Sequence, residues 1–506
     1  MTAAQPNILI VMVDQLAPAF LPAHGHKIVK TPNLDALAAS GIVFESAYCA
    51  SPLCSPSRAS FMSGLLPSHS RVYDNASEFA AAIPTYAHHL RALGYRTVLS
   101  GKMHFCGPDQ LHGFEARLTT DIYPADFGWT PDWDDPDERP NWYHNMGSVR
   151  QAGLCVRTNQ LDYDDEVTFR AERAIYDIAR SNDGRPFLLV ASLTHPHDPF
   201  AITEKYWSLY RPEDIDPPLP GVARDPHSLR LREVCAMDAV TITDDQVRNA
   251  RRAYYGAISY VDDNLGTLLA ALRATRLDED TIIVFLSDHG EMLGERGLWY
   301  KMSYLEGAAR VPLVISAPGR FKPGRVAASV SLVDILPTLV DLAGEDVGAL
   351  SGVADGRSLK PHLTGGAGHD EVIGEYLAEG VTAPMVMIRR GRWKFIHCAP
   401  DPDQLFDCAA DPREEANLAE DAAFAETLAQ FRAEVATRWD LAAIDRNVRQ
   451  SQQRRRVVDA ALHQGAPKSW DFQPVSDASR QYVRNTSALD DSEARARFPR
   501  VAKSEP

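Results

Sequence analysis

The sequence lacks the cysteine spacing of a zinc ribbon and the charge pattern of a nucleic-acid-binding protein. Its seven cysteines are irregularly spaced and none forms a C-x-x-C pair, which argues against a zinc site of that kind. The net charge is −16, so nothing in the composition predicts a basic face for nucleic acid or for an anionic membrane. A negative balance is compatible with a cationic substrate.

A basic leader and long apolar runs are also lacking. The first stretch, MTAAQPNILIVMVDQ, has no basic n-region and no small-residue cleavage site, and its apolar run ends at Asp14. A run of this length predicts a buried strand rather than a signal peptide or a membrane span. We therefore expect a protein of the reducing cytoplasm.

Apolar runs alternate with amphipathic segments along the first two thirds of the chain. The runs are typical of central parallel strands, and they lie at 7–13, 95–101, 186–193, 281–288 and 311–316. The segments between them have helical periodicity, over 31–41, 163–181 and 246–275. This order predicts an α/β fold with a large, mostly parallel central sheet flanked by helices.

The composition of the sequence changes near 344–366, where glycine and aspartate cluster. Apolar alternation and a helix from about 417 to 439 then predict a smaller α+β subdomain. We place the domain boundaries at 1–350, 351–446 and 447–506. The last segment is polar and arginine-rich with little apolar period, so we expect either a disordered tail or an arm that wraps a neighbouring subunit.

The segment SPLCSPSRASFMSG, residues 51–64, holds a cysteine, a proline and an arginine at fixed offsets. One interpretation of Cys54 is a buried structural cysteine, and another is a thiolate nucleophile at a helix N-terminus. A thiolate needs a base, and neither Pro56 nor Arg58 supplies one. The segment also resembles the signature of type I sulfatases, Cys-x-Pro-Ser-Arg with a downstream glycine, matched here by Cys54, Pro56, Ser57, Arg58 and Gly64.

This resemblance implies the alkaline-phosphatase-like fold and a specific nucleophile. A formylglycine-generating maturation enzyme oxidises the signature cysteine of sulfatases, here Cys54, to an aldehyde that hydrates to a geminal diol. One hydroxyl attacks sulfur, and the other then helps to expel sulfate and regenerate the aldehyde. By the same resemblance, Arg58 holds the diol and its surroundings.

Metal-type ligands follow two of the predicted strands, namely Asp14 and the pair Asp288 and His289. Because ligands collect at the carboxyl ends of parallel strands, these donors are suited to a divalent cation. The alternative for Asp288 is an N-capping residue in a surface loop. The resemblance adds Gln15 and Cys54 to the ligand set and implies Ca²⁺, with Mn²⁺ or Mg²⁺ as alternatives.

Lysines and histidines aimed at a breaking sulfate ester stabilise its negative charge and protonate the leaving oxygen. Residues at positions that match sulfatases are assigned this role: Lys102, His104, His197 and Lys301. Taken singly, each is more typical of a surface lysine or of a histidine with satisfied hydrogen bonds, and together, at positions that match the family, they favour catalysis. His195 stays an alternative to His197.

Residues 121–147 are rich in aromatic and acidic side chains, from Tyr123 and Trp129 to Trp142. One interpretation is a loop that packs its aromatics on the protein body. The other is a cage for a quaternary ammonium, which aromatic faces and diffuse negative charge recognise. Stretches along nearly the whole chain, among them YDNASEF, THPHDPF, MLGERGLWYKM and the tail pieces WDFQP and YVRN, resemble bacterial choline sulfatases.

The resemblance implies hydrolysis of choline-O-sulfate, with the choline head lined by Asn75, Trp129, His144, Glu379 and Asp490. It also implies a homodimer or homotetramer in which the tail crosses to another subunit. The alternatives are an arylsulfatase or a phosphonate or phosphodiester monoester hydrolase, a non-enzymatic binder of choline or sulfate, and a phosphoryl transferase. The last class uses serine or threonine at the nucleophile position, and Cys54 argues against it.

Overall fold

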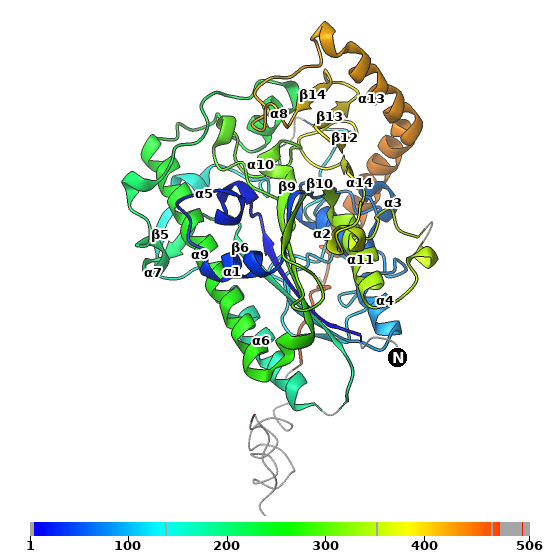
Figure 1. The fold of residues 1–506 in the computed structure, drawn as a ribbon. Coiled ribbons are helices and arrows are strands. Elements are labelled where there is room, and N and C mark those ends of the chain that lie inside the picture. The colour runs from blue at the N-terminus through cyan, green and yellow to red at the C-terminus, as the bar shows by residue number, and fades with distance from the viewer. Residues whose placement is uncertain are drawn as a thin grey trace, which may run out of the picture.

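A central sheet runs through the middle of the protein (Figure 1). It has eight strands in the order β10-β2-β9-β8-β1-β6-β3-β4. The computed structural model describes residues 5–136, 139–181, 183–350, 353–466, 469–475 and 498. The strands are β1 (Asn7–Asp14), β2 (Ile42–Tyr48), β3 (Arg96–Gly101), β4 (Ala116–Arg117), β6 (Phe187–Pro196), β8 (Thr281–Ser287), β9 (Arg310–Ser316) and β10 (Gly324–Ser331). Neighbours are parallel except at β9, which runs antiparallel to β2 and β8.

The direction of β9 differs from the prediction of a parallel strand at 311–316. β9 is buried along almost its whole length, as the parallel strands are. A run that is buried on both faces has the same composition in either direction, so its pattern predicts burial and not orientation. The prediction of a mostly parallel sheet is otherwise confirmed.

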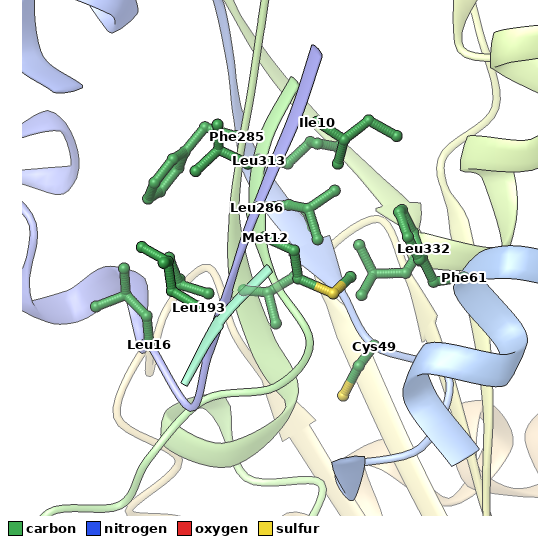
Figure 2. Close-up of a cluster of buried hydrophobic side chains, with 14 of the residues drawn as sticks. Ile10, Met12, Leu16, Cys49, Phe61, Leu193, Phe285, Leu286, Leu313 and Leu332 are labelled. Carbon is green, nitrogen blue, oxygen red and sulfur yellow. The ribbon is translucent and has the colours of Figure 1, made fainter. Parts of the chain in front are cut away.

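Helices cover both faces of this sheet (Figure 1). One face carries α1 (Pro32–Ser40), α6 (Asn159–Arg180) and α9 (Asp244–Thr275). The other carries α2 (Cys54–Ser63), α4 (Tyr86–Ala92) and α11 (Ile335–Leu342). Consecutive strand residues point to opposite faces, so Phe285 packs on the side of Leu16 and Leu193 while Leu286 packs on the side of Phe61 (Figure 2).

A second, antiparallel sheet of four strands follows: β11 (Glu371–Tyr376), β12 (Met385–Arg390), β13 (Trp393–Cys398) and β14 (Gln404–Asp407). α13 (Ala425–Arg438) buries Leu428, Phe431 and Val435 in the same apolar cluster as Phe395 of β13. This small α+β unit agrees with the predicted subdomain, with the helix beginning several residues later than expected.

The tail expected from residue 447, either disordered or an arm around a neighbouring subunit, begins inside a helix, so its first part is not disordered. Leu441–Leu462 form a 22-residue helix, α14, with residues 469–475 following it. Its buried side chains are Val448, Gln452 and Arg455. Because the buried face is mostly polar, the helix has no apolar stripe that sequence periodicity could detect. Within the described residues, no helix is long and apolar enough to cross a membrane.

Candidate active site

Four neighbouring parallel strands, β8, β1, β6 and β3, end at the same edge of the central sheet. Asp14 is the last residue of β1, and its Cα pairs with that of Pro196 at the end of β6. Asp288 and His289 follow β8, and Lys102 follows β3. The edge therefore gathers charged side chains from segments that are far apart in the sequence.

Cys54 begins α2 at this edge and is buried together with the rest of that helix. Its Sγ lies 3.2 Å from Nε2 of His289, 3.6 Å from Nζ of Lys102 and 3.9 Å from Oδ1 of Asp14. The signature segment thus forms a helix that begins among charged groups. This placement distinguishes Cys54 from a cysteine that merely fills the core.

Arg58 lies one turn further along α2 and joins the two acidic strand ends. Its Nε donates to Oδ2 of Asp288 at 2.8 Å, and its Nη2 donates to Oδ2 of Asp14 at 2.9 Å. Burial alone would raise the pKa of Asp14, but the cations of Lys102 and Arg58 hold it well below its ordinary value. The Asp14 carboxylate is therefore ready to act as an anionic ligand.

The donors present fit a divalent cation. Ligand atoms of Asp14, Cys54, Asp288 and His289, all buried, lie within 4.8 Å of one another. Nδ1 of His289 lies 3.0 Å from the Gly290 carbonyl oxygen, which can only accept, so Nδ1 carries the hydrogen. The Nε2 lone pair then faces Cys54 and Asp14, which is the tautomer that a metal-ligating histidine needs.

Gln15 lies beside this cluster with its side-chain amide held from both ends. Its Nε2 donates to Glu291, and its Oε1 accepts from Nζ of Lys301 at 2.5 Å. Its backbone is in the left-handed region, with φ of 63°. Glu291 was not anticipated from the sequence, because the segment after Asp288 reads as a polar loop.

Lys301 and His197 form a second pair of functional groups. Nζ of Lys301 lies 2.9 Å from Nε2 of His197, and Nδ1 of His197 lies 2.6 Å from the Asp198 carbonyl oxygen. Burial would lower the pKa of Lys301, but the charges of Cys54, Asp198 and Asp14 raise it, so the ammonium form persists. His195 points elsewhere: its Nδ1 contacts Asp164 at 2.7 Å, and its ring packs on Tyr260.

His104 is buried with both ring nitrogens unpartnered among the described residues. Its ring centroid lies 5.8 Å from that of Trp129 and 5.3 Å from that of Tyr123. Lys102 places its ammonium 4.1 Å from the Tyr123 ring centroid. Tyr123, which sequence reasoning placed only within an aromatic stretch, therefore links the charged edge to Trp129.

The aromatic stretch divides into two groups. Tyr123, Trp129 and Trp142 stand in series, with centroids 5.4 Å and 6.3 Å apart. Phe127 instead packs on Trp470, and the buried Trp133 donates its Nε1 hydrogen to the Ala378 carbonyl oxygen. Phe127 and Trp133 thus pack on the protein body, as the first interpretation predicts, and the cage for a quaternary ammonium stays a prediction.

The remaining residues assigned to the alcohol side lie on separate loops. Asn75 accepts a hydrogen bond from the Ser55 backbone at 3.0 Å, and His144 stacks on Tyr300 with centroids 4.4 Å apart. Glu379 is buried, lines a cavity of about 160 Å³, and has Oε2 unpartnered among the described residues. Burial raises the pKa of Glu379 to about 7. Asp490 lies outside the described residues.

Comparison with known proteins agrees with this geometry. Residues 6–345 match the sulfatase family, residues 446–498 match the choline sulfatase enzyme C-terminal family, and residues 294–439 match the N-sulphoglucosamine sulphohydrolase C-terminal family. The chain belongs to the sulfatase family. Family membership implies a divalent metal and formylglycine at Cys54, and the buried cluster around Cys54 is consistent with both.

This sulfatase is 51% identical to the choline-sulfatase of Rhizobium meliloti over 99% of its own length and 100% of that protein. It is 30% identical to an arylsulfatase of Clostridium perfringens, over 82% of this chain and 90% of the relative. Its structure superposes on the phosphonate monoester hydrolase of Agrobacterium radiobacter with a TM-score of 0.67 and 27% identity, covering 87% of this chain and 96% of that one.

Proposed function

We propose that this sulfatase hydrolyses choline-O-sulfate to choline and sulfate. The observation that carries the proposal is the position of Lys102, whose Nζ is 3.6 Å from Sγ of Cys54 and 4.1 Å from the Tyr123 ring centroid. A sulfuryl group held at Cys54 therefore lies next to the aromatic series that ends in Trp129 and Trp142. Aromatic faces are suited to a trimethylammonium head, which donates no strong hydrogen bonds. The full-length similarity to a choline-sulfatase supports the same conclusion.

The groups around Cys54 have complementary roles in this reaction. Formylglycine and the divalent cation, when present, supply the nucleophile and the stabilisation of negative charge. Asp14, Asp288 and His289 would hold the cation, while Arg58 fixes the two carboxylates relative to α2. The ammonium groups of Lys102 and Lys301 face the charge that develops on the sulfate ester.

The hydrogen-bond directions at His197 indicate where the leaving oxygen obtains its proton. Nδ1 of His197 donates to the Asp198 carbonyl oxygen, so Nε2 accepts from Lys301. Burial and the neighbouring Lys301 charge hold the pKa of His197 well below its ordinary value. Lys301 therefore holds the transferable proton, and His197 orients the ammonium that donates it.

Several finer assignments belong to the same proposal. We assign the cation as Ca²⁺, because the two carboxylates supply oxygen ligands of the kind that Ca²⁺ prefers. We place the enzyme in the cytoplasm, because all seven cysteines are free. From the resemblance we also propose maturation by a formylglycine-generating enzyme and assembly as a homodimer or homotetramer. The same resemblance supports a choline site completed by Asp490 and functional segments at 1–350, 351–446 and 447–506.

A panel of three esters tests the proposal against its alternative, an arylsulfatase or a phosphonate or phosphodiester monoester hydrolase. The structural similarity to a phosphonate monoester hydrolase favours including that class. Converted enzyme is assayed with choline-O-sulfate, p-nitrophenyl sulfate and phenyl phosphonate. We expect kcat/KM to be highest for choline-O-sulfate. Comparable turnover of the other two without a preference for choline-O-sulfate would contradict the proposal.

A further inference from the structure

The buried face of α14 is mostly polar: beside the core residue Val448, it carries polar side chains that hold loops. Arg449, Gln452 and Arg455 are spaced three residues apart, so they lie along one side of the helix. Each bonds to a loop of the preceding domains, and hydrogen bonds to charged groups are strongly directional. α14 is therefore attached by specific contacts.

Arg455 joins two of these loops. Its Nη1 and Nη2 donate to the two carboxylate oxygens of Asp74, each at 2.7 Å, and its Nη1 also donates to Oγ1 of Thr130 at 3.0 Å. Asp74 is fully buried, and the Arg455 side chain is only 7% exposed. The residues next to these two partners in sequence are Asn75 and Trp129, both assigned to the alcohol side of the site.

Arg449 and Gln452 extend the same arrangement to a third loop. Oε1 of Gln452 accepts from the Trp133 backbone at 3.0 Å, and Nη1 of Arg449 donates to the Trp133 carbonyl oxygen at 2.8 Å. Nη2 of Arg449 donates to the Thr382 carbonyl oxygen at 2.7 Å, three residues beyond Glu379. One face of α14 thus contacts the loops that carry Asn75, Trp129 and Glu379.

We propose that Arg455 is a positioning residue for recognition of the alcohol part of the ester. It fixes the loop of Asn75 relative to the loop of Trp129, so α14 sets substrate preference without contacting substrate. The inference rests on the proposed function, because that function assigns these loops to the choline head. Within the described structure, the Arg455 side chain donates hydrogen bonds to Ser451, Asp74 and Thr130, none of which is a residue assigned to sulfate cleavage.

The chemistry of arginine makes this role specific. A guanidinium is planar and presents several donors in a rigid fork, so one side chain can satisfy a carboxylate and a hydroxyl at fixed angles. A lysine keeps the charge that buried Asp74 requires but presents a single nitrogen. Arg455→Lys therefore loosens the spacing of the two loops while leaving a cation beside Asp74. Thr130→Val removes the hydroxyl that accepts from Arg455 and that also donates to the Phe127 carbonyl oxygen at 2.7 Å, while Asp74 keeps both of its hydrogen bonds from Arg455.

The test compares KM and kcat for choline-O-sulfate and for p-nitrophenyl sulfate, using fully converted enzyme. For Arg455→Lys we expect KM for choline-O-sulfate to rise about tenfold while kcat and both constants for p-nitrophenyl sulfate change less than about threefold. Thr130→Val should change the same KM in the same direction by about threefold. Arg454→Lys, on the exposed face of α14, is the matched control and should leave all four constants unchanged.

A purely structural role predicts different results. Melting temperature would fall, and the constants for both esters would change in proportion or not at all. Proportional changes for both esters in Arg455→Lys, or no change in any constant, would overturn the inference. Thr130→Val decides in the same way if Arg455→Lys does not fold. A wild-type enzyme without preference for choline-O-sulfate would instead contradict the proposed function. The comparison would then use the ester that the wild type prefers, and the role of Arg455 would still be decided.

Discussion

Lys301 and His197 form a directed pair, in which the ammonium nitrogen lies 2.9 Å from Nε2 of the imidazole. The imidazole is anchored through Nδ1 to the Asp198 carbonyl oxygen at 2.6 Å, so its ring cannot turn without losing that bond. This geometry makes Lys301 the donor and His197 its orienting partner. It also explains why a histidine held in the neutral form remains useful at the site.

Lys301→Ala should lower kcat for choline-O-sulfate by about 10²- to 10⁴-fold, the range for loss of a general acid. The loss should be smaller for p-nitrophenyl sulfate, because nitrophenolate leaves readily without a proton. His197→Gln should show the same order of sensitivity. His195→Gln is the matched control, since His195 contacts Asp164 instead of Lys301. Equal losses with both esters would remove Lys301 from proton transfer.

Trp129→Ala should weaken binding of choline-O-sulfate by about 1–2 kcal/mol, which is roughly a tenfold rise in KM, through lost cation–π attraction. The rise should be much smaller for p-nitrophenyl sulfate, which has no cationic head. Trp129→Phe keeps an aromatic face and should fall between the wild type and the alanine variant. The cage assignment fails if both esters respond alike.

As a residue proposed to line the choline head, Glu379 should give the enzyme a pH dependence with a defined sign. Burial raises the pKa of Glu379 to about 7, so the carboxylate that attracts a cation forms only as the pH rises through that value. KM for choline-O-sulfate should therefore increase as the pH falls from 8 to 6, while KM for p-nitrophenyl sulfate should not. Glu379→Gln should abolish the difference between the two esters, and a retained difference would assign it to another group.

The same pKa shift predicts an effect on stability. A carboxyl whose folded pKa is raised destabilises the protein once the pH exceeds its unfolded pKa, and the destabilisation is complete above the folded pKa. Glu379→Gln should therefore raise the melting temperature at pH 8, by the equivalent of about 3 kcal/mol, and leave it nearly unchanged at pH 4. Thermal unfolding without substrate measures this, and a variant less stable than the wild type at pH 8 would contradict it.

Chelation should abolish turnover of every ester, because the buried Asp14, Asp288 and His289 cluster is suited to one divalent cation. Elemental analysis should find about one divalent ion for each chain, and adding Ca²⁺ should restore activity. Restoration by Mn²⁺ or Mg²⁺ alone would correct the choice of metal. Full activity in metal-free enzyme would contradict the assignment of these residues.

The sequence predicts the charged edge well, for a physical reason. Asp14, Asp288 and Lys102 each follow an apolar run, and parallel strands bring such positions together whatever the loops between them do. The direction of β9 and the existence of α14 could not be predicted in this way. β9 is buried like the parallel strands of the same sheet, and the buried face of α14 is mostly polar.

The alcohol side of the site was predictable only in outline. An aromatic-rich stretch is visible in the sequence, but composition does not separate Trp129, which stands in the ring series, from Trp133, which is buried against the Ala378 backbone. That division depends on how the stretch packs against α14, through contacts such as that of Arg455 with Thr130. Tertiary contacts decide which of these tryptophans is buried, and such contacts leave no periodic pattern in the sequence.

The most direct test of the account is peptide mass spectrometry over residues 46–58, combined with turnover measured on the same samples. Enzyme prepared with different amounts of maturation enzyme should contain different fractions of the peptide about 18 Da lighter, the mass change for conversion of a cysteine to formylglycine. We expect turnover of choline-O-sulfate to rise in proportion to that fraction and to vanish in Cys54→Ala. Full turnover by protein whose Cys54 peptide has the unmodified mass would contradict the account.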